Sequence, residues 1–249
     1  MIPVYGAPAI AKLETCGRII AEFWQALKPL MVPGAVTAEL DAYAEEFIRA
    51  RGGTPAFKGY RGYPATLCIS INEEVVHGIP RANRALKPGD LVGIDVGASR
   101  DGFITDSARS YLVGPAPAPG AVKLAAVGRQ ALEDGIAAAR AGAQVRDISR
   151  AVQQRAEAAG YSVVRDLCGH GVGEKLHQEP EIPNYVKLGP SPTLQPGMCL
   201  AIEPMVNTGG HRVKFLSDGW TVVTADGGLS AHFEDTVVVT DGAPLILTR

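Results

Sequence analysis

One motif occurs twice in this sequence, and this repetition constrains the fold more than any other feature. Residues 86–95 read LKPGDLVGID and residues 194–203 read LQPGMCLAIE, so a Leu-x-Pro-Gly turn precedes an apolar run that ends in an acid. The spacing from the turn to the acid is the same in both copies. Because repeated motifs indicate an internal duplication, we expect two halves that fold alike and pack about a pseudo-twofold axis.

A weaker match elsewhere agrees with the duplication. Gly34 and Gly142 each stand just ahead of a helical pattern, one in each half of the chain. We therefore expect halves of about residues 10–114 and 121–241. Since the motifs of the two halves need each other, we expect residues 1–249 to form a single domain.

A hairpin in the first half is expected to carry two acids. Residues 91–96 have the pattern of a buried strand, Arg100-Asp101-Gly102 that of a turn, and residues 103–113 that of the returning strand. Asp95 and Asp106 then lie near each other across the hairpin. A carboxylate inside an apolar strand is costly unless a hydrogen bond, a cation or a metal compensates it. For one such acid alone, a turn-capping or salt-bridged aspartate is the simpler interpretation.

The pseudo-twofold axis adds the acids of the second half to this pair. It makes Asp95 equivalent to Glu203, and Asp106 equivalent to Glu234. His170 stands between glycines in what we expect to be a loop directly after a strand, and it would face these carboxylates. Two carboxylates about 4 Å apart repel by roughly 4 kcal/mol at an effective dielectric near 20. Such a cluster therefore needs protons or cations.

Two divalent ions would balance the four negative charges of this cluster. Oxygen-rich ligation with a single imidazole suits Mn, Fe, Co or Zn, and differs from a structural zinc site built from thiolates. Two metals about 3.5 to 4 Å apart can share a water, lower its pKa and direct it at a carbonyl or phosphoryl group. The cluster therefore predicts hydrolysis as the reaction class.

Helical and strand patterns follow the same order in both halves. Helical spacing extends over residues 9–31 and 37–50, and residues 122–141 and 147–159 repeat this helix pair. Apolar strand patterns follow at residues 65–71, 161–167, 198–207, 220–224 and 232–240. Helices followed by strands, twice over, favour an α+β fold in which helices cover the outer face of a curved, largely antiparallel sheet.

Composition excludes several classes of partner. With 24 basic and 26 acidic residues and no Lys/Arg block, the chain is expected to have neither a nucleic-acid surface nor a polybasic membrane contact. No apolar run reaches membrane length, and residues 1–10, with two prolines and no basic residue, are unlike a secretory signal. Four cysteines without CxxC spacing fit a reducing cytoplasm.

The combined motifs resemble those of the type I methionine aminopeptidases, over essentially the whole length of the chain. The matching signatures are GYRGYP at 59–64, CISIN at 68–72, HGIP at 77–80, DVG at 95–97 with Asp106, GHGVG at 169–173, His177 with EP at 179–180, IEPM at 202–205, and SA at 230–231 with Glu234. The resemblance implies the pita-bread fold. It also implies metal-dependent removal of N-terminal methionine from nascent proteins and peptides, with a preference for a small second residue.

The same resemblance assigns metal ligands. Asp95 is expected to chelate one of two divalent ions (Co, Mn, Fe or Zn), and His170 and Glu203 to bind the other. Asp106 and Glu234 are expected to bridge the pair. A water or hydroxide held between the ions then attacks the scissile carbonyl.

Two further histidines and an apolar pocket complete the implied site. His77 is expected to contact the peptide nitrogen at the scissile bond, and His177 the carbonyl oxygen as it becomes tetrahedral, a contact worth about 3 to 4 kcal/mol in comparable sites. Residues expected to line the pocket for the methionine side chain are Tyr60, Tyr63, Cys68, Leu176 and Trp220. A thioether favours such soft, aromatic surroundings. Structural hydrogen bonds for the histidines, and core packing for Cys68 and Leu176, are the simpler alternatives.

Several positions depart from the family pattern. Leu176 stands where many members carry an aromatic residue, His232 where a glutamine is usual, and Glu74 where an apolar residue is usual. Glu74 adjoins a loop near Asn72 and Ser230 that can hold a monovalent cation in relatives. These departures bear on specificity and ion binding and leave the set of metal ligands complete.

Two rival functions remain to be separated. A prolidase or aminopeptidase P would share the five ligands but usually carries a large extra N-terminal domain, whereas this chain begins at the first catalytic-domain helix. A metal-free binding module on the same fold would have lost ligands that are present here. As a methionine aminopeptidase, the protein is expected to be a cytoplasmic monomer that acts on nascent chains in transient contact with the ribosome.

Overall fold

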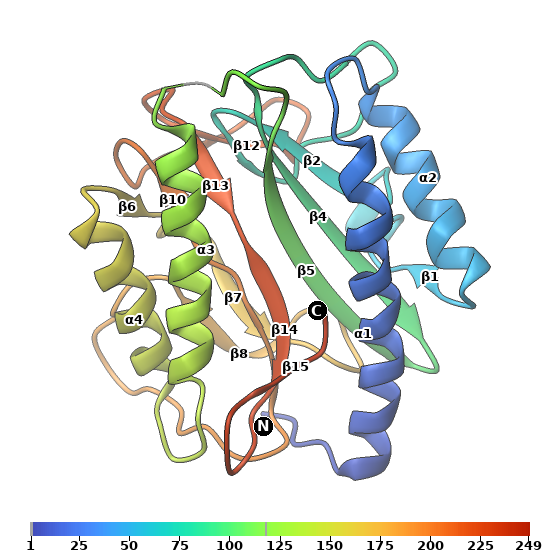
Figure 1. The fold of residues 1–249 in the computed structure, drawn as a ribbon. Coiled ribbons are helices and arrows are strands. Elements are labelled where there is room, and N and C mark those ends of the chain that lie inside the picture. The colour runs from blue at the N-terminus through green and yellow to red at the C-terminus, as the bar shows by residue number, and fades with distance from the viewer. Residues whose placement is uncertain (1, 118) are drawn as a thin grey trace.

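Helices cover one face of a large sheet in the computed structural model (Figure 1), which describes residues 2–117 and 119–249. The described α-helices are α1 (Ala7–Leu27), α2 (Thr37–Ala50), α3 (Ala121–Ala138) and α4 (Val145–Ala158). Figure 1 shows α1 and α2 over one half of the sheet and α3 and α4 over the other. Met1 and Ala118, which the expected domain includes, lie outside the described residues.

Within these residues the main sheet has nine strands in the order β1-β4-β5-β14-β9-β7-β8, with β2 also paired with β4 and β15 with β14. Their bounds are β1 Thr54–Pro55, β2 Leu67–Ile71, β4 Leu91–Arg100, β5 Phe103–Leu112, β7 Cys168–Gly171, β8 Gln178–Pro183, β9 Cys199–Ile202, β14 Glu234–Val238 and β15 Leu245–Ile246. Two smaller sheets are formed by β13 (Ser230–His232), β10 (Met205–Asn207) and β6 (Ser162–Val163), and by β11 (Val213–Phe215), β12 (Val222–Thr224) and β3 (Glu74–Val76). The paired strands are antiparallel, so the expected α+β class is confirmed.

Corresponding hydrogen bonds in the two halves agree with the internal duplication. Gly34 N donates to Leu86 O at 2.8 Å, and Gly142 N donates to Leu194 O at 2.9 Å. The leucine of each Leu-x-Pro-Gly turn is thus held by the glycine that precedes the second helix of its half. At the centre of the sheet β5 and β14 lie side by side, flanked by β4 and β9 (Figure 1). The two halves therefore meet along β5 and β14.

Two expected strands are broken in the structure. The strand expected over residues 198–207 is interrupted at Glu203 and Pro204 between β9 and β10, because proline has no N–H to continue the ladder. The strand expected over residues 232–240 is interrupted at Phe233, between β13 and β14. Phe233 N donates to Pro204 O at 3.3 Å, so the two breaks lie opposite each other.

Several other boundaries need smaller corrections, of which two have a clear cause or extent. The helix expected over residues 9–31 becomes α1 followed by a 3-10 turn at Lys28–Leu30. This turn contains Pro29, whose ring cannot be accommodated in a continuing α-helix. Of the strand expected over residues 161–167, only Ser162–Val163 pairs, with β10.

Two apolar clusters hold the helices against the sheet. In the first half Phe23 of α1 and Ile48 of α2 pack in one cluster with Ile94 of β4. In the second half Leu132 of α3 and Val152 of α4 pack in another, with residues of β9. Burial of each such side chain contributes about 1.5 to 3 kcal/mol to the stability of the folded state. Since the helices occupy this face, the opposite face of the sheet is left for a site.

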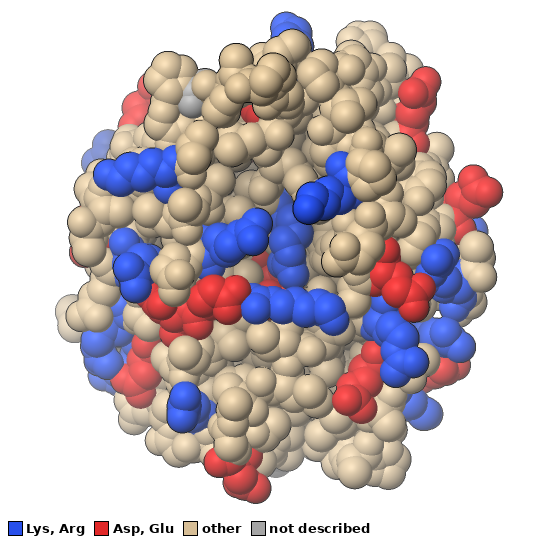
Figure 2. Space-filling model, in the orientation of Figure 1, with Lys and Arg blue, Asp and Glu red and all other residues tan. Residues whose placement is uncertain are grey.

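The helix face carries charges of both signs. Figure 2 shows Lys and Arg beside Asp and Glu across this face, in keeping with the formal net charge of −2. Among the described residues, no helix combines the length and apolarity that a bilayer crossing requires.

Candidate active site

Alternation along β4 determines which face of the sheet carries the acids. Ile94 and Val96 are fully buried in the cluster with α1 and α2, so Asp95 between them points to the opposite face. Asp95 pairs with Ala108 of β5, and Glu234 of β14 pairs with the same Ala108. A single small residue thus separates two carboxylates in one row across three strands.

A second row of residues lies one pleat further along the same face. Asp106 of β5 is two residues from Ala108 and is joined to β14 at Thr236, since Asp106 N donates to Thr236 Oγ1 at 2.8 Å. Thr236 pairs with Ala201 of β9, and Ala201 pairs with His170 of β7. The residues between Asp106 and His170 in this row are Thr236, whose side chain bonds to the Asp106 backbone, and the small residue Ala201. Asp106 and His170 can therefore approach each other.

The five residues expected to bind metal are brought together at these rows. One ligand atom from each of Asp106, His170 and Glu234 lies within 4.8 Å of the others. Glu203, at the break after β9, places Oε1 3.5 Å from His170 Nε2. Asp106 Oδ2 is 3.9 Å from the same nitrogen. Asp95 lines the cavity that these four residues share.

The setting of His170 differs from the expectation of a loop, because His170 lies within β7. The flanking glycines allow the neighbouring strands β9 and β8 to approach this short strand closely. A Cβ on Gly169 would lie 2.5 Å from Ala201 O, and a Cβ on Gly171 would overlap Glu179 O. Side chains at these two positions would push β7 away from its neighbours and displace the imidazole.

Burial leaves this cluster of carboxylates short of hydrogen-bond donors. Asp95 Oδ1, Asp106 Oδ1 and Glu234 Oε1 are buried and accept no hydrogen bond from the described residues. Burial raises the pKa of Asp106 to about 7. Burial, reinforced by the neighbouring carboxylates, raises the pKa of Asp95, Glu203 and Glu234 well above the ordinary values. Since buried carboxylates need neutralising partners, this oxygen-rich donor set fits divalent cations.

The histidines of the site favour the neutral form. Burial, with a smaller effect from His177, lowers the pKa of His170 to about 3 and that of His77 to about 4. Burial and the Arg61 guanidinium lower the pKa of His177. A neutral imidazole is the form that binds a metal through one ring nitrogen, and it carries a single N–H to donate.

A cavity of about 280 Å³ opens over the carboxylates. Besides the five acidic and imidazole residues already described, the residues that line it are Phe57, Tyr60, Arg61, Tyr63, Cys68, His77, Leu176, His177 and Trp220. This set contains every residue expected to bind substrate. It also contains Phe57 and Arg61, which the sequence reasoning did not select. Arg61 belongs to the GYRGYP signature, so its place in that motif was an available signal.

Aromatic rings form one wall of the cavity. The rings of Tyr63 and Trp220 meet edge to face, with centroids 5.0 Å apart, and the His77 ring lies 6.2 Å from Trp220. Asp218 holds the turn that carries Trp220, because its Oδ1 accepts hydrogen bonds from Trp220 N at 3.0 Å and Thr221 N at 2.9 Å. The position of Trp220 in this wall therefore depends on the Asp218 carboxylate, which lies two residues before it.

His177 bridges this cavity and the acidic cluster. Its ring meets the ring of His170 edge to face at 4.4 Å. Its Nδ1 lies 2.8 Å from the Tyr60 hydroxyl. A hydroxyl that donates to Nδ1 leaves the N–H of a neutral imidazole on Nε2.

Comparison with known proteins identifies the family. Residues 11–241 match metallopeptidase family M24. The chain belongs to this family. A methionine aminopeptidase of Clostridium perfringens is 48% identical over 248 residues, which cover 100% of this chain and 99% of the relative. Membership of a metallopeptidase family makes this M24 chain an enzyme, a hydrolase that uses divalent metal.

Solved structures agree with the family assignment. The crystal structure of a methionine aminopeptidase from Thermotoga maritima matches the M24 chain with a TM-score of 0.97 and 40% identity, over 100% of both chains. A prolidase from Pyrococcus furiosus matches with a TM-score of 0.79 at 22% identity, over 99% of this chain and 65% of the prolidase chain. The second likeness shows a shared fold alone. The pita-bread fold and the resemblance to methionine aminopeptidases are thereby confirmed.

The loop considered for a monovalent cation in this M24 chain is held together by backbone contacts. Ser230 N donates to Asn72 O at 2.9 Å, and Asn72 has a left-handed φ of 59°. Glu74, the departure in this loop, forms a 3.0 Å ion pair with Arg84, and its other oxygen accepts from Ile71 N. The Glu74 carboxylate is therefore engaged at the edge of the loop.

Proposed function

We propose that this M24 peptidase removes N-terminal methionine from peptides and nascent proteins whose second residue is small. The observation that supports this proposal best is the continuity of two chemistries in one cavity. Donor atoms for divalent ions lie at its base, and Tyr63, Trp220 and Cys68 line the same space. A thioether side chain suits such an aromatic and sulfur-lined pocket. The similarity to methionine aminopeptidases over the whole chain points to the same substrate.

In this proposal the acidic cluster holds two divalent ions, from among Co, Mn, Fe and Zn. Asp95 would help to hold one ion, His170 and Glu203 would hold the other, and Asp106 and Glu234 would serve both. When bound, the ions supply a water of lowered pKa and a Lewis acid for the scissile carbonyl. The protein contributes a face of the sheet on which ligand atoms of Asp106, His170 and Glu234 already converge.

The two other histidines are assigned to the peptide. We assign the Tyr60 hydroxyl as the donor to His177 Nδ1, so that His177 Nε2–H is available to the carbonyl oxygen as negative charge develops there. His77 is assigned to the peptide nitrogen at the scissile bond. Its ring packs against Trp220, which lines the proposed methionine pocket, and this contact supports the assignment.

The test is hydrolysis of Met-Ala-Ser and Ala-Pro-Ser by chelator-stripped protein titrated with Mn, Co, Fe and Zn. We expect metal-dependent release of methionine from Met-Ala-Ser and no cleavage of Ala-Pro-Ser. Asp106→Asn should abolish the release. Asp101→Asn is the matched control, because Asp101 is an exposed acid in the turn of the same hairpin, with a φ of 52° that asparagine tolerates.

Other outcomes of this experiment separate the alternatives. Cleavage of Ala-Pro-Ser in preference to Met-Ala-Ser would assign the protein to the proline-specific peptidases that share the fold. Absence of both cleavage and metal binding would favour a binding module without metal.

The remaining assignments concern the whole protein. We propose that it is a single catalytic domain and a monomer in the cytoplasm, acting on nascent chains in transient contact with the ribosome. A monovalent cation near Asn72 and Ser230 is part of the same proposal. Sedimentation of the protein alone tests whether it is a monomer, and sedimentation with ribosomes tests the ribosome contact. Activity in sodium or potassium salts, compared with activity in the salt of a large organic cation, tests the monovalent cation.

A further inference from the structure

A buried histidine, His232, lies beside the acidic cluster, and its Nε2 has no hydrogen-bond partner among the described residues. The His232 side chain, at the end of β13, is 4% exposed, and Nε2 itself is buried. A buried polar atom in this state costs about 1 to 3 kcal/mol, so its retention calls for a reason.

The backbone around His232 is held firmly in place. His232 N donates to Ser110 Oγ at 3.0 Å, and Ser110 Oγ donates to His232 O at 2.9 Å. His232 also pairs with Met205 of β10. The imidazole therefore projects from a point where the main sheet and a small sheet are joined, and the main chain that carries it is bonded to both.

A carboxylate of the cluster lies close to this nitrogen. His232 Nε2 lies 3.6 Å from Glu203 Oε2, while Glu203 Oε1 lies 3.5 Å from His170 Nε2. Each oxygen of Glu203 is thus directed at a different imidazole. The main chain of Glu203 is held as well, because Asn184 Nδ2 donates to Glu203 O at 3.0 Å.

We propose that His232 is a positioning residue for Glu203. His232 Nε2–H donates to Glu203 Oε2 and so keeps Oε1 turned toward His170, where both side chains serve the same divalent ion. A shift of less than about 1 Å brings the pair into the usual hydrogen-bond range. The inference rests on the proposed function, because it assumes that Glu203 and His170 hold a cation.

The geometry favours this role over direct ligation by His232. All five expected ligands line the cavity over the cluster, and His232 is not among the described residues that line it. His232 instead approaches the cluster through Glu203. A partner that orients a ligand in this way typically changes metal affinity 10- to 100-fold when it is removed.

The experiment compares His232→Leu with His232→Gln by calorimetric titration of chelator-stripped protein with Co²⁺. Leucine keeps an apolar side chain in the buried site and removes the donor, whereas glutamine retains an N–H. We expect His232→Leu to weaken one of the Co²⁺ binding steps 10- to 100-fold and His232→Gln to stay within about threefold of the wild type. The metal-free His232→Leu protein should melt no lower than the wild type, because the substitution removes an unpartnered buried nitrogen.

Each other result has a distinct meaning. Wild-type protein that binds no Co²⁺ overturns the proposed metal site itself. Wild-type protein that binds Co²⁺ while His232→Leu binds it equally well overturns the role of His232 and leaves the site intact. Equal weakening in both variants also overturns it, because the loss then does not follow the donor.

A spectroscopic measurement separates positioning from ligation. In the Zn²⁺-loaded protein labelled with ¹⁵N-histidine, we expect His232 to show a proton on Nε2. Loss of this proton with a nitrogen shift typical of metal coordination would show that His232 is a ligand and would overturn the proposal.

Discussion

At the scale of single residues, burial without a hydrogen-bond partner shifts the pKa of acidic side chains in this protein. Asp106 is the clearest case, because it is 4% exposed and its Oδ1 accepts no hydrogen bond from the described residues. Burial raises its pKa to about 7. The metal-free folded protein therefore binds a proton at Asp106 more tightly than the unfolded chain does.

The sign of this shift predicts how the stability of chelator-stripped protein depends on pH. The contribution of Asp106 is fully present below its unfolded pKa, near 4, and is lost as the pH rises through about 7. Each pH unit in this window is worth about 1.4 kcal/mol for one group. Urea denaturation of stripped protein should therefore show the free energy of unfolding falling from pH 5 to pH 7, and more weakly in Asp106→Asn. Equal pH dependence in the two proteins would contradict this account.

The hydroxyl of Tyr60 provides a second test at this scale. It lies 2.8 Å from His177 Nδ1, and Tyr60→Phe removes it while keeping the ring in the cavity. A hydrogen bond of this kind is worth about 1 kcal/mol, so we expect kcat for Met-Ala-Ser to fall roughly 5- to 10-fold with a smaller change in KM. Tyr43→Phe on α2, outside the cavity, is the control. Unchanged kcat in Tyr60→Phe would remove Tyr60 from the orientation of His177.

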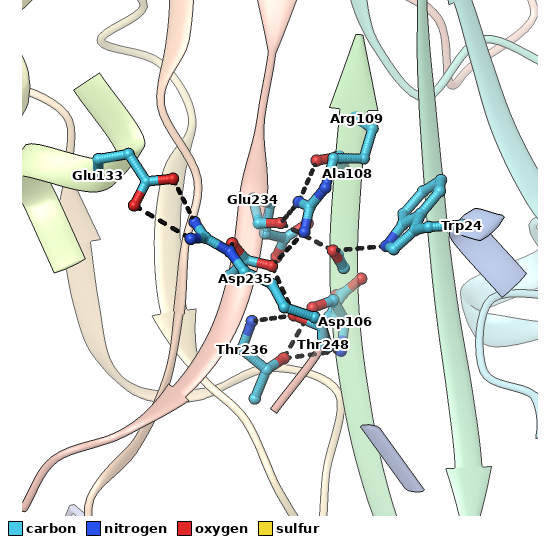
Figure 3. A network of polar contacts seen from close by, with 11 residues as sticks. Trp24, Asp106, Ala108, Arg109, Glu133, Glu234, Asp235, Thr236 and Thr248 are labelled. Carbon is cyan, nitrogen blue, oxygen red and sulfur yellow. Dashed lines mark hydrogen bonds and ion pairs between the residues drawn. The ribbon is translucent and has the colours of Figure 1, made fainter. Parts of the chain in front are cut away.

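Among the elements, β14 links the site to the helix face through its alternating side chains. Glu234 points into the cavity, and Asp235 points to the opposite side, where it is fully buried (Figure 3). Asp235 accepts hydrogen bonds from Arg109, from Thr248 Oγ1 at 2.7 Å and from Arg249 Nε at 2.8 Å. This network joins β5, β14 and the C-terminal segment behind the proposed metal ligands.

The same network predicts a large difference between two substitutions. Asp235→Ala leaves Arg109 largely buried without its carboxylate and should lower the free energy of unfolding by about 3 to 5 kcal/mol. Glu133→Gln breaks the pair between Arg249 and Glu133, whose side chains are 37% and 39% exposed, and should cost no more than about 1 kcal/mol. Urea denaturation of both variants tests the ranking. Similar losses would show that burial does not decide the energetics of this network.

For the whole molecule, the proposed metal site joins the two halves of the chain. Asp95 and Asp106 come from the first half, and His170, Glu203 and Glu234 from the second. The halves already share the interface between β5 and β14. An ion held by residues of both halves is bound only by the folded protein, so it adds its binding free energy to the stability of the fold.

Metal removal should therefore lower the melting temperature. A divalent ion at 100 times its Kd adds about 2.7 kcal/mol, which corresponds to roughly 5 to 10 °C for a chain of this size. Differential scanning calorimetry with and without chelator measures the shift. Asp106→Asn should abolish it and Asp101→Asn should retain it. A shift of the same size in Asp106→Asn would place the stabilising ion elsewhere.

Much of the architecture follows from local patterns in the sequence. The helix pairs, the hairpin from Leu91 to Leu112 and the repeated Leu-x-Pro-Gly turns were predictable because periodicity and turn chemistry act over a few neighbouring residues. The duplication then indicated which acids share a site, since equivalent positions in two similar halves meet near the axis. The five candidate ligands could thus be selected without coordinates.

Other features depend on contacts between distant segments. His170 belongs to a strand because Ala201 lies beside it, and the strand around Phe233 breaks because Pro204 faces it. Phe57 lines the cavity through its place in the folded chain. These contacts are set by packing, which no local pattern encodes, so tertiary structure alone placed them. The sequence specified the two halves and their acids, and the way these halves close on each other decided the cavity around them.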